Sequence, residues 1–487
     1  MHWHKQVNIT AAAAIQVFFL MLYYAWVSPF FLYHNDIGWH LATGDLIRAR
    51  GSIPVTDPWA YTSGGWPWIN LSWLWDVLAS ALYAKSGAMG LLALTACVGV
   101  ATLALLGDVA RRLGGRPPLV LALCLYIGVV FPFYEPPDIF LAAAPQQASL
   151  LFCAATLGLL QRVQQQFSRW QAAMVAGLFA LWANMHGGFL AGYAMLALMA
   201  LAALAQGQRL LARRCAMLLA VAVAATLANP YSTDVFEGVR GTLGHIFQQD
   251  VSEWQPLYKQ GISLVFLSPS LLYTAVFLLA LAPWRRWRQA DPFAWMLLAV
   301  SLLLLAKGVL VLRYFSLFLL VSLPATAWGL SQLLPHATQD EPRMRHPLPA
   351  LLVAAVLALG VMQGRNPAPI RMPTERDPEA EIAYILQQHP QARIINHWNY
   401  GSFLIFHAGG RLQPFIDGRM GTAYPDAVFS DLQALYASGD WGALLDKYHA
   451  QVVLWPRGYD RILAWFEGRI DWHEALRGEL AVVLVKN

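Results

Sequence analysis

The stretch Trp182–Arg209, WANMHGGFLAGYAMLALMALAALAQGQR, contains an apolar run from Leu190 to Leu204 without a charged residue. Apolar side chains occupy every helical face of this run, so no polar face is left for water. Comparable runs recur between Ala11 and Val361. They predict a protein that crosses a membrane many times, because a bilayer accepts apolar surface that a soluble core cannot bury.

The composition agrees with a membrane protein and excludes an ordinary soluble one. Of the 487 residues, 57% are hydrophobic and 13% are charged, about half the charged share of a typical soluble domain. The net charge of +5 does not indicate a nucleic-acid partner, since the arginines cluster between apolar runs, where they orient membrane proteins. Cys97, Cys124, Cys153 and Cys215 all fall inside predicted spans, so no disulfide framework is expected.

The apolar runs predict about eleven membrane spans. These are Ala11–Tyr33, Met89–Leu106, Pro118–Tyr134, Gln146–Leu160, Ala172–Asn184, Leu190–Leu204, Ala212–Ala228, Leu264–Ala282, Phe293–Ala306, Val309–Leu330 and Leu348–Met362. The first of them lacks a small-residue cleavage site and is expected to be a retained anchor. The stretch Leu71–Lys85 carries Trp73, Trp75 and Asp76, and we predict that it forms a helix lying on the bilayer surface.

The distribution of basic residues predicts the topology. One set of loops carries Lys5, Arg111, Arg112, Arg116, Arg162, Arg169, Arg209, Arg213, Arg214, Arg285, Arg286, Arg288, Arg343 and Arg345. The other set of loops is longer but carries fewer basic residues, namely Arg48, Arg50, Lys85, Arg240, Lys259, Lys307 and Arg313. The positive-inside rule therefore predicts a cytoplasmic amino terminus, and an odd number of spans places the carboxyl terminus on the outer side.

The sequence divides into a membrane domain, a linker and a soluble domain. We place the membrane domain at residues 1–363, with a first outer loop and its juxtamembrane helices at 34–87, and the proline-containing linker at 364–378. Residues 379–487 alternate strand-like and helical patterns, which predicts a small α/β domain, incomplete as a doubly wound sheet. The expected strands are Arg393–Asn396, Gln451–Trp455 and Ala481–Val485, and the expected helices are Glu379–Gln388 and Ala427–Leu445.

The first outer loop contains the first candidate site residues. Asp36 stands where an apolar helix meets solvent, so its carboxylate could bind a metal or take a proton from an acceptor group. The alternative is that Asp36 caps the predicted helix Ile37–Arg48. His40 lies four residues later on the same helical face, although a lone histidine is more often structural. Asp57 precedes Pro58 in a turn and is interpreted as structural.

Two further clusters follow along the chain. In FYEPPD, Glu135 and Asp138 are held three residues apart by two prolines and could join a cation site facing Asp36; the alternative is a solvated turn. In WANMHGGF, Asn184 and His186 interrupt apolar sequence at the end of a span. Polar residues at membrane depth tend to face a cavity, whereas the glycine pair could simply turn the chain.

The remaining candidates surround the tenth predicted span. Arg313 lies near its outer end, with Lys307 in the preceding turn. Both side chains could anchor the protein by reaching the membrane surface. The sharper interpretation is a phosphate clamp, because an arginine fork matches phosphate oxygens. In DVSEWQP, the sequence pattern alone assigns no function to Glu253.

Taken in order, these residues resemble the polyprenyl-linked sugar transferases of the GT-C superfamily, above all the catalytic subunit of oligosaccharyltransferase. Asp36 resembles the acid of that family's opening motif, and YEPPD takes the place of the second acidic motif, although it is neither D-x-D nor D-x-E. VSEWQP resembles the S-V-S-E motif, with Glu253 as its acid. LVLRYF places Arg313 where the family has an arginine facing the lipid-linked phosphate. The layout is also similar to a broad set of bacterial membrane proteins.

The soluble domain carries one more motif of the resemblance. HWNYGSFLIFHAGG is similar to the W-W-D-Y-G motif that recognises the acceptor sequon in that family. Here His397-Trp398-Asn399 replaces the tryptophan-tryptophan-aspartate core, while Tyr400 and Gly401 are kept. The resemblance therefore implies an acceptor-binding role for His397, Trp398, Asn399 and Tyr400.

The resemblance implies an inverting glycosyltransferase in the bacterial inner membrane, with a periplasmic C-terminal domain. A polyprenyl phosphate or diphosphate sugar would be the donor, and a protein such as a pilin, a lipid or a glycan the acceptor. The implied roles are catalysis for Asp36 and Glu253, donor-phosphate binding for Arg313 and Lys307, and binding of Mg²⁺ or Mn²⁺ for Asp36, Glu135, Asp138 and Glu253.

Two functions of other classes stay open. A transporter or flippase of lipid-linked sugars would line a path across the membrane midplane with ionisable residues. Here the candidates gather on one predicted side, which favours chemistry at the surface. A non-catalytic relative that assists a partner enzyme is the second alternative, because the second acidic motif and the tail motif depart from the family pattern.

Overall fold

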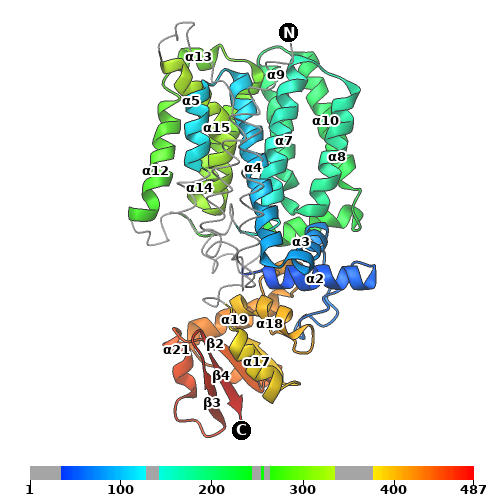
Figure 1. Cartoon of the computed structure of the whole chain (residues 1–487), viewed down its shortest axis with the longest axis vertical. Helices are drawn as coiled ribbons and strands as arrows, with labels where there is room; N and C mark the ends of the chain where they lie inside the picture. The colour runs from blue at the N-terminus through cyan, green and yellow to red at the C-terminus, as the bar shows by residue number, and fades with distance from the viewer. Residues whose placement is uncertain (1–34, 128–141, 244–253, 257–263, 335–376) are drawn as a thin grey trace. The chain divides into compact units, whose positions relative to one another are not determined.

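The computed structural model describes residues 35–127, 142–243, 254–256, 264–334 and 377–487 (Figure 1). The predicted spans Ala11–Tyr33 and Leu348–Met362 lie outside these residues. The chain forms two compact units. Among the described residues, the helical unit comprises 92–127, 142–229, 254–256 and 264–334, and the mixed unit comprises 35–91, 230–243 and 377–487.

The helical unit is a bundle of long apolar helices that run side by side (Figure 1). Its helices are α4 (Ala88–Leu113, which begins within the mixed unit), α5 (Pro117–Leu125), α7 (Gln146–Gln165), α8 (Arg169–Met185), η2 (Gly187–Phe189), α9 (Leu190–Ala205), α10 (Arg209–Thr226), α12 (Leu264–Leu279), α13 (Trp284–Arg288), α14 (Pro292–Leu310) and α15 (Arg313–Leu333). Small residues let these helices approach closely. A Cβ at Gly329 of α15, for example, would collide with the carbonyl oxygen of Ala280.

Among the residues that the structure describes, four helical segments are long and apolar enough to cross a membrane, so the prediction of a membrane protein is confirmed. They are Ala88–Leu113, Gly187–Ala205, Pro292–Leu310 and Arg313–Leu333. The other predicted spans among the described residues fall on α5, α7, α8, α10 and α12, which do not meet the same criterion of length and apolarity. Helix α5 covers only part of the predicted span Pro118–Tyr134, whose second half lies outside the described residues, and α7 ends in the polar sequence QRVQQ. The predicted tenth span began too early, because Val311 is extended and separates α14 from α15.

The ends of the helices identify which loops lie at the same end of the bundle. Gln206, after α9, donates to the carbonyl oxygen of Ala290 at 3.0 Å, and Gln164 near the end of α7 donates to Asp291 at 2.6 Å. The ends of α7 and α9 therefore meet the start of α14. Because α9 and α14 pack along each other, the start of α9 lies beside the end of α14. The starts of α7 and α9 are therefore at the same end of the bundle as the turn between α14 and α15. We call this the His186 end of the bundle.

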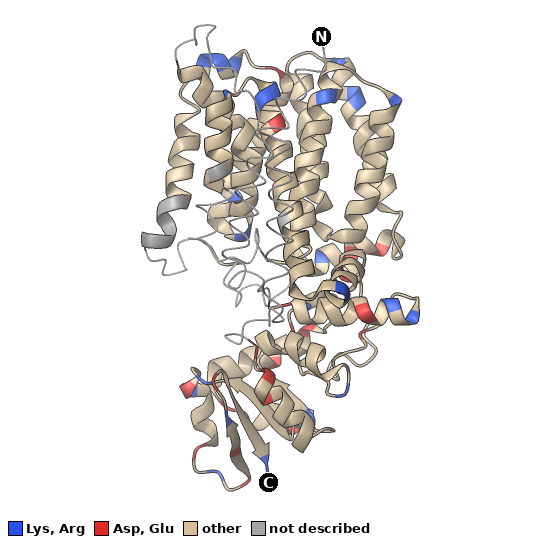
Figure 2. Cartoon of the chain, viewed as in Figure 1, with Lys and Arg blue, Asp and Glu red and all other residues tan. Residues whose placement is uncertain are grey.

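Basic residues gather at the opposite end, where α13 lies (Figure 2). Arg285, Arg286 and Arg288 belong to α13, and Arg209, Arg213 and Arg214 belong to the first turns of α10. The His186 end carries Lys307 in the last turn of α14 and Arg313 at the start of α15. This asymmetry has the form that the positive-inside rule requires, while the assignment of one end to the cytoplasm stays a prediction.

The mixed unit combines the first outer loop with the tail. Its elements are α2 (Ile37–Arg50), α3 (Trp73–Ser86), η3 (Ser232–Asp234), α11 (Val235–Leu243), α17 (Glu379–Gln388), β1 (Ile394–Asn396), α18 (Trp398–Ala408), η7 (Met420–Thr422), α19 (Asp426–Ser438), α20 (Gly442–Tyr448), β2 (Val452–Pro456), α21 (Asp460–Leu463), η8 (Ala464–Phe466), β3 (Trp472–Arg477) and β4 (Ala481–Lys486). The domain boundaries at 363 and 378 stay predictions; the compact unit reaches across the chain to include residues of both the loop and the tail.

The sheet of the mixed unit has the order β1-β2-β4-β3. Strands β1 and β2 are parallel, with Ile395 opposite Val453, whereas β4 is antiparallel to both β2 and β3. The expectation of an incomplete doubly wound sheet is therefore corrected to a mixed sheet. The physical reason is the short connection between Arg477 and Ala481, which allows a hairpin but not the crossover that parallel strands need.

Local sequence signals located most elements of the tail. Helix α17 has the predicted bounds, and β1, β2 and β4 lie on the three predicted strands. The single helix predicted at Ala427–Leu445 is wrong, because Gly439 adopts a left-handed conformation with φ of 72° and ends α19. Strand β3 and helix α18 were not predicted. Helix α18 begins within the HWNYG motif, with His397 at its N-cap position.

Candidate functional site

The start of α2 packs against α18 within the mixed unit. The side-chain amide of Asn35 donates to Oδ1 of Asn399 at 2.9 Å, and the amide of Trp39 donates to Oγ of Ser402 at 3.0 Å. A Cβ at Gly38 would collide with the carbonyl oxygen of Ser402, so only glycine allows this approach. Two motifs far apart in the sequence, the opening acidic motif and the tail motif, therefore meet in one place.

Asp36 occupies the N-cap position of α2, but its side chain makes no capping hydrogen bond. The alternative in which this carboxylate caps the helix is therefore wrong. Its oxygen lies against the backbone of Gly418, where a Cβ would collide with Oδ1 of Asp36. The carboxylate is thus held at the turn Ile416–Arg419, next to the residue pair that joins α2 to α18.

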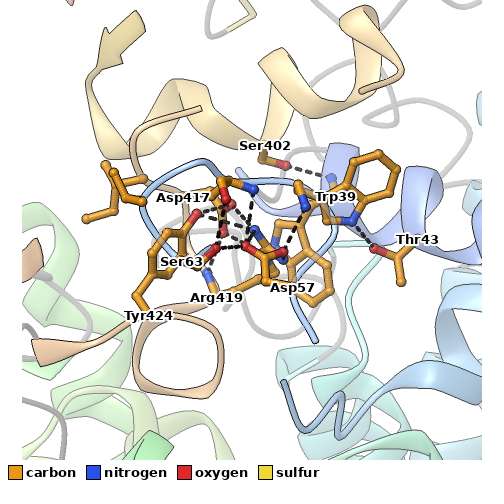
Figure 3. A network of polar contacts seen from close by, with 12 residues as sticks. Trp39, Thr43, Asp57, Ser63, Ser402, Asp417, Arg419 and Tyr424 are labelled. Carbon is orange, nitrogen blue, oxygen red and sulfur yellow. Dashed lines mark hydrogen bonds and ion pairs between the residues drawn. The ribbon is translucent and has the colours of Figure 1, made fainter. Parts of the chain in front are cut away.

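A buried ionic network fixes that turn (Figure 3). Arg419 donates to Asp417 at 2.7 and 2.9 Å and pairs with Asp57 of the first outer loop. The hydroxyl of Tyr424 donates to Asp417 at 2.6 Å. The side chains of Arg419, Asp57 and Asp417 are fully buried. Burial opposes the charged guanidinium, but Asp417 and Asp57 outweigh it and hold the pKa of Arg419 above its usual range.

The network confirms the structural interpretation of Asp57. Its carboxylate also accepts hydrogen bonds from the backbone amides of Trp59 at 3.0 Å and Ala60 at 3.1 Å, so it organises its own turn. Sequence reasoning did not assign a role to Asp417 or Arg419. The available signal was the placement of two opposite charges around a glycine in FIDGR, a combination that must pair when it is buried.

The four residues of the tail motif divide into two kinds. His397 caps α18, since its Nδ1 accepts from the amide of Asn399 at 3.3 Å, and burial lowers its pKa to about 3. The hydroxyl of the buried Tyr400 donates to the carbonyl oxygen of Leu480 at 3.2 Å. Trp398 and Asn399 are half-buried, and Asn399 contacts the segment of Asp36.

His40 belongs to a closed arrangement beside this site. Its Nδ1 lies 2.6 Å from Oδ1 of Asp76, whose other oxygen accepts from the side chain of Asn70 at 2.7 Å. His40 and Asp76 are both buried. The pairing explains why the apolar helix α3 carries an acid: Asp76 faces a histidine rather than solvent. The contact fits the structural alternative for His40.

In the helical unit, the predicted phosphate clamp lies at the turn between α14 and α15. The guanidinium of Arg313 is stacked over the ring of Trp254, 5.0 Å from its centre. The amide of Leu312 donates to the carbonyl oxygen of Gln255 at 3.2 Å. The WQP part of the VSEWQP motif is therefore attached to the start of α15, and Lys307 lies in the last turn of the preceding helix.

His186 ends α8 at the same end of the bundle. Its Nδ1 lies 2.6 Å from Oγ of Ser149 and accepts from the amide of Gly188 at 3.1 Å. Trp182 in turn donates to Oγ of Ser149 at 2.7 Å. Ser149 thus links Trp182 to His186, and the side chain of Asn184 donates to the carbonyl oxygens of Ala180 at 2.7 Å and Ala228 at 2.8 Å.

The predicted cation site can be compared with the structure only in part. Glu135, Asp138 and Glu253 lie outside the described residues, so Asp36 alone is placed. Among the residues that the structure describes, no group of three or more histidine, cysteine or acidic side chains could hold a metal ion. The cation stays a prediction of the sequence.

The sequence matches no protein-family model and no protein of curated function. The structure, however, is similar to several structures of an oligosaccharyltransferase from Archaeoglobus fulgidus. AglB in complex with an inhibitory peptide and a dolichol-phosphate has a TM-score of 0.64 at 13% identity, covering 96% of this chain and 71% of that one.

The complex with zinc and sulfate has a TM-score of 0.59 at 14% identity and covers 94% and 70% of the two chains. The form tethered by a disulfide bond to an acceptor peptide with an NVT sequon has a TM-score of 0.61 at 13% identity, covering 99% and 74%. The fold is therefore similar to that of the archaeal oligosaccharyltransferase, the kind of protein that the sequence motifs resemble.

Proposed function

We propose that this protein is a membrane glycosyltransferase. It moves a sugar or glycan from a polyprenyl phosphate or diphosphate to an acceptor at the periplasmic face of a bacterial inner membrane. The observation that carries the proposal is the position of Asp36, whose carboxylate lies against the turn of Gly418 beside the tail motif, in a chain with an oligosaccharyltransferase-like fold over 96% of its length.

The acceptor half of the proposal rests on the mixed unit. The Asp36 carboxylate is not used to cap α2, and the pair of Asn35 and Asn399 holds its segment beside the half-buried Trp398 and Asn399. A carboxylate held in this way can take a proton from an acceptor hydroxyl or amide. Asp36 would act with Glu253, and the tail motif would position the acceptor.

The donor half rests on the helical unit. Arg313 offers a guanidinium fork that suits phosphate oxygens, and Trp254 restrains it by stacking. Lys307 would add a second positive charge from α14. The similar proteins were solved with a dolichol-phosphate and with an acceptor peptide, which supports a lipid-linked donor and makes a protein the first acceptor to try, before a lipid or a glycan.

A divalent cation fits the proposed set of ligands by its chemistry. Asp36, Glu135, Asp138 and Glu253 are all carboxylates, the hard oxygen ligands that Mg²⁺ and Mn²⁺ prefer. When bound, the cation would supply neutralisation of the leaving phosphate. The zinc in the structure of a similar protein supports a metal in this fold.

The test measures release of the polyprenyl carrier by the purified full chain, given polyprenyl diphosphate sugars and an acceptor peptide, with and without Mn²⁺. Asp36→Asn keeps the size of the side chain and removes the base, so turnover should fall by about 100-fold or more. Asp45→Asn is the matched control, because Asp45 lies on the same helix but is exposed and pairs with the neighbouring Arg48.

Unchanged turnover in Asp36→Asn contradicts the proposal. Activity that survives EDTA contradicts the need for a cation and leaves Asp36 with the role of a base alone. If the wild-type chain binds the donor but releases no carrier with any acceptor, the transporter and accessory functions become the better explanations.

A further inference from the structure

Helix α13 concentrates positive charge at the end of the helical unit opposite the His186 end (Figure 2). Its sequence WRRWR exposes three arginines, which are Arg285, Arg286 and Arg288. Among the residues that the structure describes, none of these three side chains forms an ion pair. The described part of the helical unit contains only two acids. Asp291 caps α14 and accepts from Gln164 at 2.6 Å, and Asp108 pairs with Arg112 at 2.9 Å. Neither neutralises α13.

Trp287 fixes α13 against three helices of the unit. Its side chain is buried, and its Nε1 donates to the carbonyl oxygen of Ala280, just after α12, at 2.9 Å. Its own carbonyl oxygen accepts from Nε1 of Trp295 on α14 at 2.8 Å. Its ring packs edge-on against Trp328 on α15, with 4.4 Å between the ring centres. The arginines on either side of Trp287 therefore start from a fixed backbone, which lowers the cost of ordering them around a ligand.

The turn between α4 and α5 lies against the same part of α15. A Cβ at Gly114 would lie 3.6 Å from Cδ1 of Trp328, and the amide of Arg116 donates to Oγ of Ser331 at 2.9 Å. The guanidinium of Arg116 donates to the carbonyl oxygen of Leu334 at 3.2 Å, a neutral partner that leaves its charge in place. Arg116 thus adds a fourth positive charge beside the end of α15.

Apolar surface adjoins this positive charge. Leu278 and Leu279, in the last turn of α12, are 51% and 55% exposed, and Trp284 at the start of α13 is 58% exposed. Tryptophan is enriched where the apolar part of a bilayer meets the headgroups. The surface therefore combines a wall that suits acyl chains with cations that suit phosphate oxygens. A soluble anion would need only the cations, whereas an anionic phospholipid matches both features.

We propose that the exposed arginines of α13 form a binding site for an anionic phospholipid. The guanidinium groups hold the headgroup phosphate, Trp284 marks the boundary with the apolar region, and the acyl chains lie along the exposed leucines of α12. The site is at the opposite end of the bundle from Arg313. It is therefore separate from the proposed donor site and does not depend on the proposed function.

The test measures lipid binding to the purified full chain in detergent by native mass spectrometry. The probe is phosphatidylglycerol, and phosphatidylcholine with the same acyl chains is the zwitterionic control. The test variant is Arg285→Gln/Arg286→Gln/Arg288→Gln. The matched control is Arg169→Gln/Arg209→Gln/Arg213→Gln, which removes the same charge from α8 and α10 at the same end of the bundle. All six arginines are exposed, so we expect both variants to fold.

We expect the α13 variant to bind phosphatidylglycerol about 10- to 100-fold more weakly, because each lost arginine removes attraction for an anionic headgroup. The control variant should stay within about 3-fold of wild type, and phosphatidylcholine binding should not change. Glycerol phosphate, the soluble headgroup, should not displace the lipid, because it has no chains to contact α12.

Three outcomes overturn the proposal. Equal losses in the two triple variants would show a general attraction by positive charge instead of a site on α13. A wild-type chain that binds both lipids alike would show that the headgroup charge is not recognised. Displacement by glycerol phosphate would make a soluble anion the occupant. Carrier release is not measured in this test, so failure of the proposed glycosyltransferase activity leaves its result unchanged.

Discussion

Asn35 donates a hydrogen bond to Asn399 at 2.9 Å, across 364 positions of sequence. The bond joins the residue before Asp36 to the residue that stands where the related W-W-D-Y-G motif has an aspartate. An amide oxygen can accept this bond without charge, whereas an aspartate here would bring a second carboxylate close to Asp36 and disfavour the ionised form of both. The departure from the W-W-D-Y-G pattern therefore fits the contact that the structure makes.

Gly418→Ala should disable the site by displacing the Asp36 carboxylate. The new Cβ would collide with Oδ1 of Asp36, so we expect turnover to fall by about 10-fold or more, on the scale of a misplaced catalytic group. Gly458→Ala is the matched control, because nothing lies within 4 Å of that position. Carrier release by the two purified variants checks the prediction.

The same substitution allows a coupling test of the contact. Any destabilisation by Gly418→Ala should largely disappear in the background of Asp36→Ala, because the colliding atoms are removed. Thermal midpoints of the two single variants and the double variant measure this coupling. Additive effects would show that Gly418 and Asp36 do not touch.

Arg419→Gln should unfold or strongly destabilise the mixed unit. It leaves Asp57 and Asp417 buried without their cation, which costs about 3–5 kcal/mol of the free energy of unfolding. Arg477→Gln removes an exposed pair with Glu474 and should cost less than about 1 kcal/mol. Hydrogen exchange of the β2 amides reports the stability of this unit in the full chain. Equal exchange in the two variants would contradict the role of the network.

His407 should make the stability of the mixed unit fall at alkaline pH. Burial by itself would lower the pKa of His407, but its hydrogen bonds to Asp377, at 2.8 and 3.0 Å, and the charges of Asp377 and Glu379 raise it above the usual 6.5. The contribution of His407 to the free energy of unfolding is therefore complete below pH 6.5. It is lost as pH rises through the raised pKa.

Thermal midpoints of the full chain between about pH 6 and about pH 9 cover this window. His407→Gln can still donate to Asp377 but does not titrate, so it should flatten the dependence. His473→Gln, at an exposed histidine that bonds Asn487, should leave the slope as in wild type. If the thermal midpoint of His407→Gln still depends on pH in this window, another titrating group causes the dependence.

His397 should have the opposite effect in acid. Burial lowers its pKa from 6.5 to about 3, so the unfolded chain takes up the proton first and stability falls as pH drops below 6.5. At about pH 5 the loss should be on the order of 2 kcal/mol, from about 1.4 kcal/mol per pH unit. His397→Asn keeps an acceptor for the amide of Asn399 and should lose this acid slope, as measured by hydrogen exchange of β2. An unchanged slope would exclude His397 as its source.

Sequence reasoning identified the parts of the fold that depend on local pattern. The apolar runs located the long helices, the spacing of α17 gave its bounds, and the β-branched runs gave β1, β2 and β4. Gly439 was the missed local signal, since its left-handed conformation ends α19 inside a continuous helical pattern. Strand β3, with the sequence WHEALR, carries charges that obscure the alternation of an edge strand.

Sequence alone thus determined that this is a membrane protein of many apolar helices with an α/β tail, because bilayer solvation and backbone periodicity act on short stretches. Only the tertiary structure decided which distant residues meet. It brought Asp36 to Gly418, Asn35 to Asn399 and Arg419 to Asp57. Such pairings depend on how elements pack and on the need of buried charges for partners, and neither is written in the local pattern of the residues concerned.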